Sequence, residues 1–139
     1  MKEIYSNINI IGGGLIGTTT AIALSQLGYK ITVLEQNSVY NFKAKHDDHR
    51  TVAISEGSKN FLTELGLWKY IQPFSEPIKK IRVIDRKLAN MLEFDNERRT
   101  SNLGYIVENK NLLDILYTSI KKNKNVSIFN NIKIKDIQN

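Results

Sequence analysis

The first 35 residues contain two kinds of apolar spacing. A strand is predicted from about Ile4 to Ile11. A strand buried on both faces of a parallel sheet should be almost continuously apolar, so Asn9 interrupts the expected pattern and would need hydrogen-bond partners there. Apolar positions from Leu15 to Leu27 predict a helix that Gly28 ends, and Ile31 to Leu34 predicts a second strand. A strand, a helix and a second strand in this order indicate that the two strands pair in parallel.

A glycine-rich turn joins the first predicted strand to the helix. It reads Gly12-Gly13-Gly14-Leu15-Ile16-Gly17, and Glu35 follows the second predicted strand. A G-x-G-x-x-G motif between a strand and a helix, with an acid after the next strand, is typical of a dinucleotide-binding unit. The alternative is a strand, a turn and a helix that bind nothing.

Each part of this motif has a physical role in such a unit. Gly12 allows the tight turn, Gly14 lets the backbone approach a pyrophosphate, and Gly17 lets the helix pack close to the sheet. The N–H groups at the helix N-terminus then face the phosphates. We expect Glu35 to accept hydrogen bonds from the adenosine ribose hydroxyls, and its charge disfavours NADP. The candidate cofactor-binding residues here are Gly12, Gly13, Gly14, Leu15, Ile16, Gly17 and Glu35.

Residues 36–107 interrupt the nucleotide-binding pattern. A helix is predicted from Ser55, a suitable N-cap, to Leu65. Polar and apolar residues alternate over Lys80 to Ile84 and over Leu92 to Phe94, which predicts a hairpin. Leu103 to Val107 predicts one more strand. These elements indicate an antiparallel hairpin or small sheet inserted into the parallel fold.

The nucleotide-binding pattern resumes after this insertion. One face of a helix is predicted from apolar residues at helical spacing: Leu112, Ile115, Leu116 and Ile120. Val126 to Phe129 predicts a third parallel strand, and another strand is predicted to begin at Ile132. We therefore predict an α/β protein with an incomplete Rossmann-like fold of three parallel strands. In the usual strand order, the first strand would lack its outer neighbour.

The composition narrows the possible functions. The chain of 139 residues has no cysteine, which excludes disulfides, thiolate metal sites and a cysteine nucleophile within it. Its net charge is +6, but the lysines are spread along the sequence, which disfavours nucleic-acid binding. No apolar run approaches the ~18 residues of a membrane span. We therefore expect a cytoplasmic protein, and peripheral contact with the inner membrane stays open.

Three further stretches carry more specific motifs. Asp48-His49-Arg50-Thr51-Val52-Ala53-Ile54-Ser55 contains D-x-R followed by A-I-S, residues 58–68 fit S-x-x-x-L-x-x-L-G-x-W, and residues 104–109 read G-Y-I-V-E-N. Together with the glycine motif, they resemble the N-terminal part of FAD-dependent aromatic hydroxylases. The most similar branch comprises the 2-polyprenylphenol and 2-octaprenyl-6-methoxyphenol hydroxylases of ubiquinone biosynthesis.

The resemblance implies a flavin-dependent monooxygenase that hydroxylates a polyprenyl phenol. FAD would be the cofactor, NAD(P)H the electron donor, and a flavin hydroperoxide formed with O2 would transfer one oxygen atom to the ring. The resemblance also places Arg50 near the pyrophosphate or the flavin, where a guanidinium suits an anion. The alternative for Arg50 is a solvated loop arginine. Residues 46–49 are expected to shape this turn rather than to hold a metal. No residue can be assigned as catalytic.

Members of this family are longer than this sequence. The later G-D and D-G motifs and most of the substrate pocket are absent, so we expect residues 1–139 to be the N-terminal part of an FAD-binding domain. Residues 36–107 would be an excursion that includes the start of the substrate-side sheet. A split gene, a truncated reading frame and a piece prepared for expression all stay open. A separate chain carrying the C-terminal half is an expected partner. The alternatives are another FAD-dependent oxidoreductase of the same fold and an inactive, truncated nucleotide-binding remnant.

Overall fold

The computed structural model describes residues 5–38, 49–84, 91–95 and 102–136. The chain divides into two compact units. The first consists of Met1–His49 and Asn109–Asn139, and the second of Arg50–Glu108. The first unit therefore contains the glycine motif, and the second contains the predicted hairpin.

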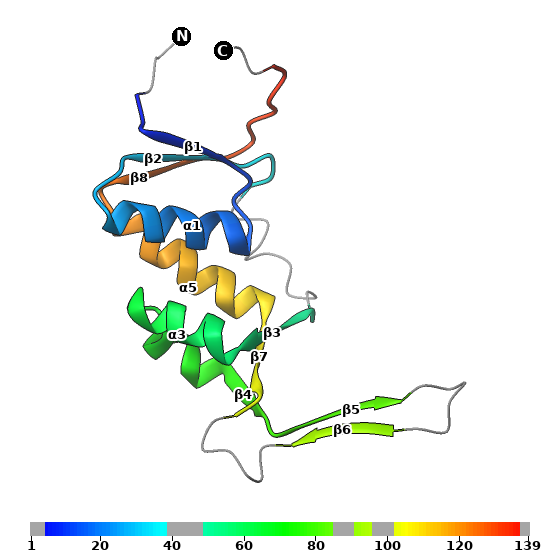
Figure 1. The fold of residues 1–139 in the computed structure, drawn as a ribbon. Helices are drawn as coiled ribbons and strands as arrows, with labels where there is room; N and C mark the ends of the chain where they lie inside the picture. Colours follow the sequence, from blue (N-terminus) through cyan, green and yellow to red (C-terminus); the bar gives the residue numbers. More distant parts are fainter. Residues whose placement is uncertain (1–4, 39–48, 85–90, 96–101, 137–139) are drawn as a thin grey trace. The chain divides into compact units, whose positions relative to one another are not determined.

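A parallel sheet of three strands is the framework of the first unit (Figure 1). Its strands are β1 (Ile8–Ile11), β2 (Ile31–Leu34) and β8 (Val126–Phe129). They pair in the order β1-β2-β8, with Ile31 in register with both Ile8 and Val126. The prediction of an α/β fold with three parallel strands is confirmed. Within the described residues β1 pairs with β2 alone, as the usual strand order predicts.

Two helices, α1 (Leu15–Gln26) and α5 (Asn109–Lys121), cover one face of this sheet (Figure 1). Gly28 follows α1 with a φ of +90°, the left-handed conformation expected of a glycine after a helix. The buried residues of α5 are Leu112, Leu113, Leu116, Tyr117 and Ile120. Ile115, predicted on the buried face, is half-buried instead. Two neighbouring stripes of apolar residues on α5 fit the helical spacing, and the packing of α5 on α1 determines which of them is buried.

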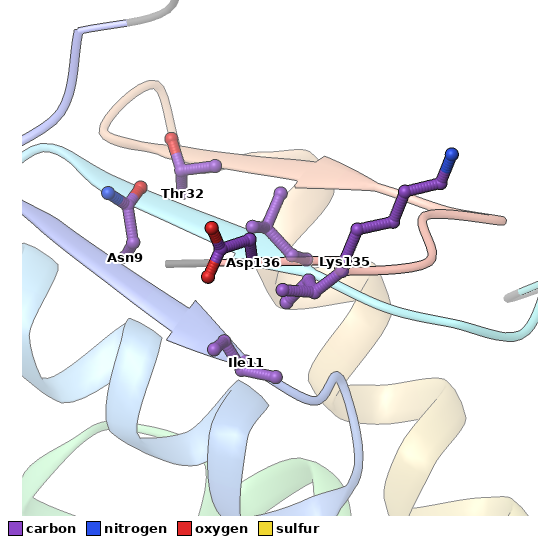
Figure 2. A pocket seen from close by; sticks show the side chains of 7 residues that line it. Asn9, Ile11, Thr32, Lys135 and Asp136 are labelled. Atoms are coloured by element: carbon purple, nitrogen blue, oxygen red, sulfur yellow. The ribbon is translucent and has the colours of Figure 1, made fainter. Parts of the chain in front are cut away.

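The opposite face of the sheet is partly exposed in the described residues. Asn9 and Ile11 are exposed there, and the Asn9 side-chain oxygen accepts a hydrogen bond from the Ser6 hydroxyl at 2.8 Å. The prediction that both faces of the first strand are buried is therefore wrong for this chain, because α1 and α5 lie on the other face. Figure 2 shows a cavity on this open face, lined by Asn9, Ile11, Thr32, Leu34, Ile134, Lys135 and Asp136.

The segment after β8 does not form the further strand predicted from Ile132. Asn131 has a φ of 59°, in the left-handed region, and this turn interrupts the extended backbone. The Ile132 N–H donates to the Glu35 carbonyl at 3.0 Å, and no strand forms over residues 130–136. Ile137, the last apolar position of the predicted strand, lies outside the described residues.

An antiparallel sheet with short helices forms the core of the second unit (Figure 1). Its strands are β3 (Thr51–Ser55), β7 (Gly104–Glu108) and β4 (Ser75–Ile78), paired in the order β3-β7-β4. Its helices are α3 (Glu56–Glu64), α4 (Trp68–Ile71) and the 3-10 turn η1 (Gln72–Phe74). The predicted helix cap is confirmed, because the Ser55 hydroxyl accepts the Ser58 N–H at 3.2 Å. Across the part of the chain that the structure describes, no helix has the length and apolar character needed to cross a membrane.

The predicted hairpin consists of β5 (Lys80–Ile84) and β6 (Met91–Asp95), and its turn lies outside the described residues. Pairing places Ile81 opposite Phe94 and Val83 opposite Leu92. Because side chains alternate along a strand, these four apolar residues share one face, and all four are exposed. The inserted antiparallel hairpin is therefore confirmed.

Candidate functional site

The loop from β1 to α1 makes a sharp turn at Gly12. Its φ of +102° lies in the region that L side chains rarely adopt, and its N–H donates to the Leu34 carbonyl at 2.9 Å. The hydrogen bond ties the turn to the end of β2. Glycine is therefore needed at this position for the backbone to leave the sheet at this angle.

Gly17 and Gly14 are glycines for two different steric reasons. A Cβ added to Gly17 would lie 2.0 Å from the Gly12 carbonyl oxygen, so the first turn of α1 packs directly on the loop backbone. A Cβ added to Gly14 would meet no atom within 4 Å. Gly14 therefore borders open space, which is the room that a pyrophosphate close to the backbone requires.

The first turn of α1 presents backbone donors beside this space. Thr18 is the first residue of α1 whose N–H donates to a carbonyl one turn earlier. Its N–H donates to the Gly14 carbonyl oxygen at 3.0 Å, and its hydroxyl donates to the same oxygen at 2.7 Å. The N–H groups of Leu15, Ile16 and Gly17 precede it and have no acceptor one turn earlier in the helix. No acidic residue lies in the first turn of α1. The positive end of the helix dipole therefore favours an anion here.

Glu35 is a buried carboxylate directly after β2, with 6% of its surface exposed. One of its oxygens, Oε2, accepts the Gly13 N–H at 2.6 Å. The other, Oε1, accepts the Asn37 N–H at 2.7 Å and the Asn37 side-chain amide at 3.2 Å. A carboxylate oxygen can accept more than one hydrogen bond, so Glu35 retains capacity for a hydroxyl donor.

Tyr117 reaches the same loop from α5. Its side chain is buried, and its hydroxyl donates a hydrogen bond to the Gly13 carbonyl. Burial, and after it the negative charge of Glu35, raises the pKa of Tyr117 from 10.0 to about 12. The phenol therefore stays a hydrogen-bond donor at neutral pH. Leu15 and Ile128 pack against the cluster that Tyr117 forms with Leu113.

The first unit brings together all but one of the predicted cofactor-binding residues: Gly12, Gly13, Gly14, Leu15, Ile16, Gly17 and Glu35. Arg50 belongs to the second unit, where it is exposed immediately before β3, and its contact with a cofactor stays a prediction. Residues 46–48 lie outside the described residues. Among the residues that are described, no group of three His, Cys, Asp or Glu could hold a metal ion.

Two residues at this site, Tyr117 and Asn37, are absent from the sequence-based prediction. The signal for Tyr117 is an aromatic residue with a hydroxyl on a helix that carries an apolar stripe, because a buried tyrosine hydroxyl needs a partner. The partner, Gly13, is 104 positions away, and periodicity cannot reveal it. Asn37 follows Glu35 by two positions, a spacing at which side-chain amides often bond to nearby groups.

The part of the chain that contains this glycine loop is similar to known proteins. The family model for FAD-dependent oxidoreductases matches residues 7–59. Ubiquinone hydroxylase UbiL of Rhodospirillum rubrum is 31% identical over 115 residues, which cover 83% of this chain and 27% of that protein. The 3-demethoxyubiquinol 3-hydroxylase of Escherichia coli is 30% identical over 125 residues, which cover 88% of this chain and 32% of that protein. The chain therefore spans less than a third of the length of these relatives.

A solved structure has the same fold. It is the p-nitrophenol 4-monooxygenase PnpA from Pseudomonas putida DLL-E4. The similarity covers 100% of this chain and 34% of that enzyme, with a TM-score of 0.74. The sequence identity is 19%, so this similarity bears on the fold and not on the substrate.

Proposed function

We propose that this chain is the N-terminal, FAD-binding portion of a flavin-dependent monooxygenase, because it matches the family model for FAD-dependent oxidoreductases and is similar to ubiquinone hydroxylase UbiL and to 3-demethoxyubiquinol 3-hydroxylase. The observation that carries the proposal is the loop from Gly12 to Gly17. It combines open space at Gly14, backbone donors at the start of α1 and the buried carboxylate of Glu35. These groups fit the adenosine diphosphate half of FAD.

Two parts of this half of FAD, the pyrophosphate and the ribose, would find matching groups in the chain. The N–H groups at the start of α1 would bind the pyrophosphate, and Glu35 would accept hydrogen bonds from the ribose hydroxyls. Arg50 would add a cation near the pyrophosphate or the flavin. Bound FAD supplies the redox chemistry by which one oxygen atom of O2 reaches an aromatic ring. The protein's part is to bind and orient the cofactor.

The complete enzyme is proposed to take electrons from NAD(P)H and to hydroxylate a polyprenyl phenol. The support is the kinship with proteins named as ubiquinone hydroxylases. Because the chain spans less than a third of the length of these relatives, the substrate pocket would come from further polypeptide, for example a separate chain carrying the C-terminal half. A polyprenyl tail partitions into a bilayer, so we propose peripheral membrane contact for the complete enzyme.

FAD retention by the isolated chain tests the cofactor proposal. The protein is mixed with FAD, desalted, and examined for flavin absorbance beside a Gly14→Asp variant. An aspartate side chain has space at this position, and Gly14 is the N-cap of α1, where aspartate stabilises a helix. The variant should therefore fold with an unchanged or higher melting temperature, while its added negative charge repels the pyrophosphate.

We expect flavin to stay with the unaltered chain and to be lost from Gly14→Asp. A Gly14→Asn variant of the same size and without the charge is the matched control, and it should retain more flavin than the aspartate variant. Soluble, folded protein that retains no flavin would contradict the proposal and favour an inactive remnant.

A further inference from the structure

We propose that Tyr117 is a positioning residue that fixes the Gly13–Gly14 peptide so that the Gly14 N–H is presented to the FAD pyrophosphate. The inference rests on the proposed function, because it assigns a role in binding that cofactor. Tyr117 lies on α5, outside the glycine motif, and it would act through the loop backbone rather than by touching the cofactor.

The argument begins with the geometry of the peptide group. The Gly13 carbonyl and the Gly14 N–H belong to one peptide unit, and the described chain has no cis peptide bonds. In a planar trans peptide these two groups point in opposite directions. Because the Tyr117 hydroxyl holds the Gly13 carbonyl toward α5, the Gly14 N–H must point away from α5. Gly14 itself borders open space, since a Cβ added to it would meet no atom within 4 Å.

A second buried side chain holds the preceding peptide. The Gly13 N–H donates to Glu35 Oε2 at 2.6 Å, which fixes the Gly12–Gly13 peptide. Two successive peptide units of the loop are therefore fixed by buried partners, one acidic and one phenolic. Without them, three consecutive glycines would sample many conformations and would lose that freedom when the cofactor binds.

The space around Gly13 is closed by the same two side chains. A Cβ at Gly13 would lie 3.0 Å from the Tyr117 hydroxyl oxygen and 3.1 Å from the Glu35 Cβ. Tyr117 also forms an apolar cluster with Leu113, and Leu15 and Ile128 pack against this cluster. The hydroxyl is therefore held at the loop by packing, as a positioning group must be.

The test is the affinity of a Tyr117→Phe variant for FAD. Phenylalanine keeps the ring and its packing and removes the hydroxyl. We expect FAD to bind about tenfold more weakly, because one orienting hydrogen bond is lost. Tyr105→Phe is the matched control. Its hydroxyl accepts a hydrogen bond from the Asn102 side chain at 3.0 Å in the second unit, and its loss should leave FAD affinity unchanged.

A second measurement separates positioning from general stability. Tyr117→Phe loses a buried hydrogen bond and Tyr105→Phe a partly buried one, so both melting temperatures should fall, while FAD affinity falls in Tyr117→Phe alone. Equal FAD affinity in the unaltered chain and Tyr117→Phe would overturn the inference. An equal loss of affinity in both variants would also overturn it, because it would indicate a general effect of stability.

The amide signals of the loop glycines distinguish failure of this inference from failure of the proposed function. If the unaltered chain binds no FAD, the proposed function fails, and nuclear magnetic resonance of the free chain decides the inference. Displaced Gly13 and Gly14 amide signals in Tyr117→Phe, with unchanged signals in Tyr105→Phe, would support orientation of the loop by Tyr117. Unchanged Gly13 and Gly14 signals in Tyr117→Phe would overturn it.

Discussion

The loop between β1 and α1 and the hairpin of β5 and β6 are stabilised by different kinds of contact. The loop is held by buried groups from distant parts of the chain, Glu35 and Tyr117, both bonded to Gly13. In the hairpin, Glu93 accepts hydrogen bonds from Lys80 at 2.7 Å and Arg82 at 2.6 Å on an exposed surface. The hairpin's apolar face is also exposed.

The buried contacts of the loop define its backbone geometry, whereas the exposed contacts of the hairpin do not. A hydrogen bond to a buried partner is expensive to lose, because the remaining group stays unsatisfied. An exposed ion pair can exchange its partner for water at little cost. We therefore expect substitutions around the glycine loop to change stability and binding strongly, and substitutions in the hairpin to change them weakly.

Gly17→Ala should have the largest effect on stability. The added Cβ would lie 2.0 Å from the Gly12 carbonyl oxygen, a backbone atom, so α1 or the loop must move. We expect the free energy of unfolding to fall by about 3 kcal/mol, as for overpacking in a rigid site. Denaturant titration followed by circular dichroism measures this change.

Gly57→Ala is the control for this substitution, because it places the same methyl group in a helix of the second unit. The nearest atom to its Cβ would be the Ser55 hydroxyl oxygen at 3.9 Å, an ordinary contact. Alanine should raise the free energy of unfolding by about 0.5 kcal/mol through its better helix propensity. Equal losses for the two variants would show that tight packing at Gly17 is not the cause.

A loss of stability at high pH, through Tyr117 at the glycine loop, is the next largest expected effect. The pKa of Tyr117 is raised from 10.0 to about 12 in the folded chain, so the folded state keeps the phenol proton after the unfolded state has lost it. The stability that this group contributes is therefore complete below pH 10.0 and is lost as the pH rises toward about 12. The near-ultraviolet absorbance of phenolate, recorded for the unaltered chain and for Tyr117→Phe, measures the ionisation.

The difference between the two titration curves isolates Tyr117 from the other tyrosines. We expect this difference to show one group that titrates later than the rest. A difference curve with its midpoint near 10 would contradict the buried hydrogen bond to Gly13.

Glu93→Gln in the hairpin should have the smallest effect. The Lys80 ammonium, and after it the Arg82 guanidinium, lowers the pKa of Glu93 below 4.5. Any stability from this carboxylate is present above pH 4.5 and is lost as the pH falls through the lower pKa of the folded state. Because the site is exposed, we expect no measurable change in melting temperature at neutral pH. A loss comparable with that of Gly17→Ala would show that the hairpin depends on this ion pair.

The sequence was informative where a feature depends on neighbouring residues. The three parallel strands, the cap at Ser55 and the hairpin each follow from local spacing, and the structure confirms them. Asn9 was misjudged because burial of the second sheet face depends on what covers it, which strand periodicity does not report. The strand predicted from Ile132 was wrong because the left-handed turn at Asn131 overrides the alternation of apolar residues.

In the candidate site, too, features that depend on neighbouring residues could be predicted and those that depend on distant residues could not. Gly12 and Gly17 are recognisable from motif spacing, because turn and helix packing are local requirements. Tyr117 was not recognisable, because its partner lies in another segment that meets it only after folding. The role of Arg50 stays a prediction, since it belongs to the second unit.

The hydrogen bond between Tyr117 and Gly13 has a consequence for the order of events during synthesis. The two residues are 104 positions apart, and translation delivers the N-terminal residue first. When β1, α1 and β2 have left the ribosome, the nascent chain therefore carries the whole glycine motif, while α5 is still to be made. The loop cannot reach its final geometry until α5 has left the ribosome, so cofactor capture should follow the synthesis of α5.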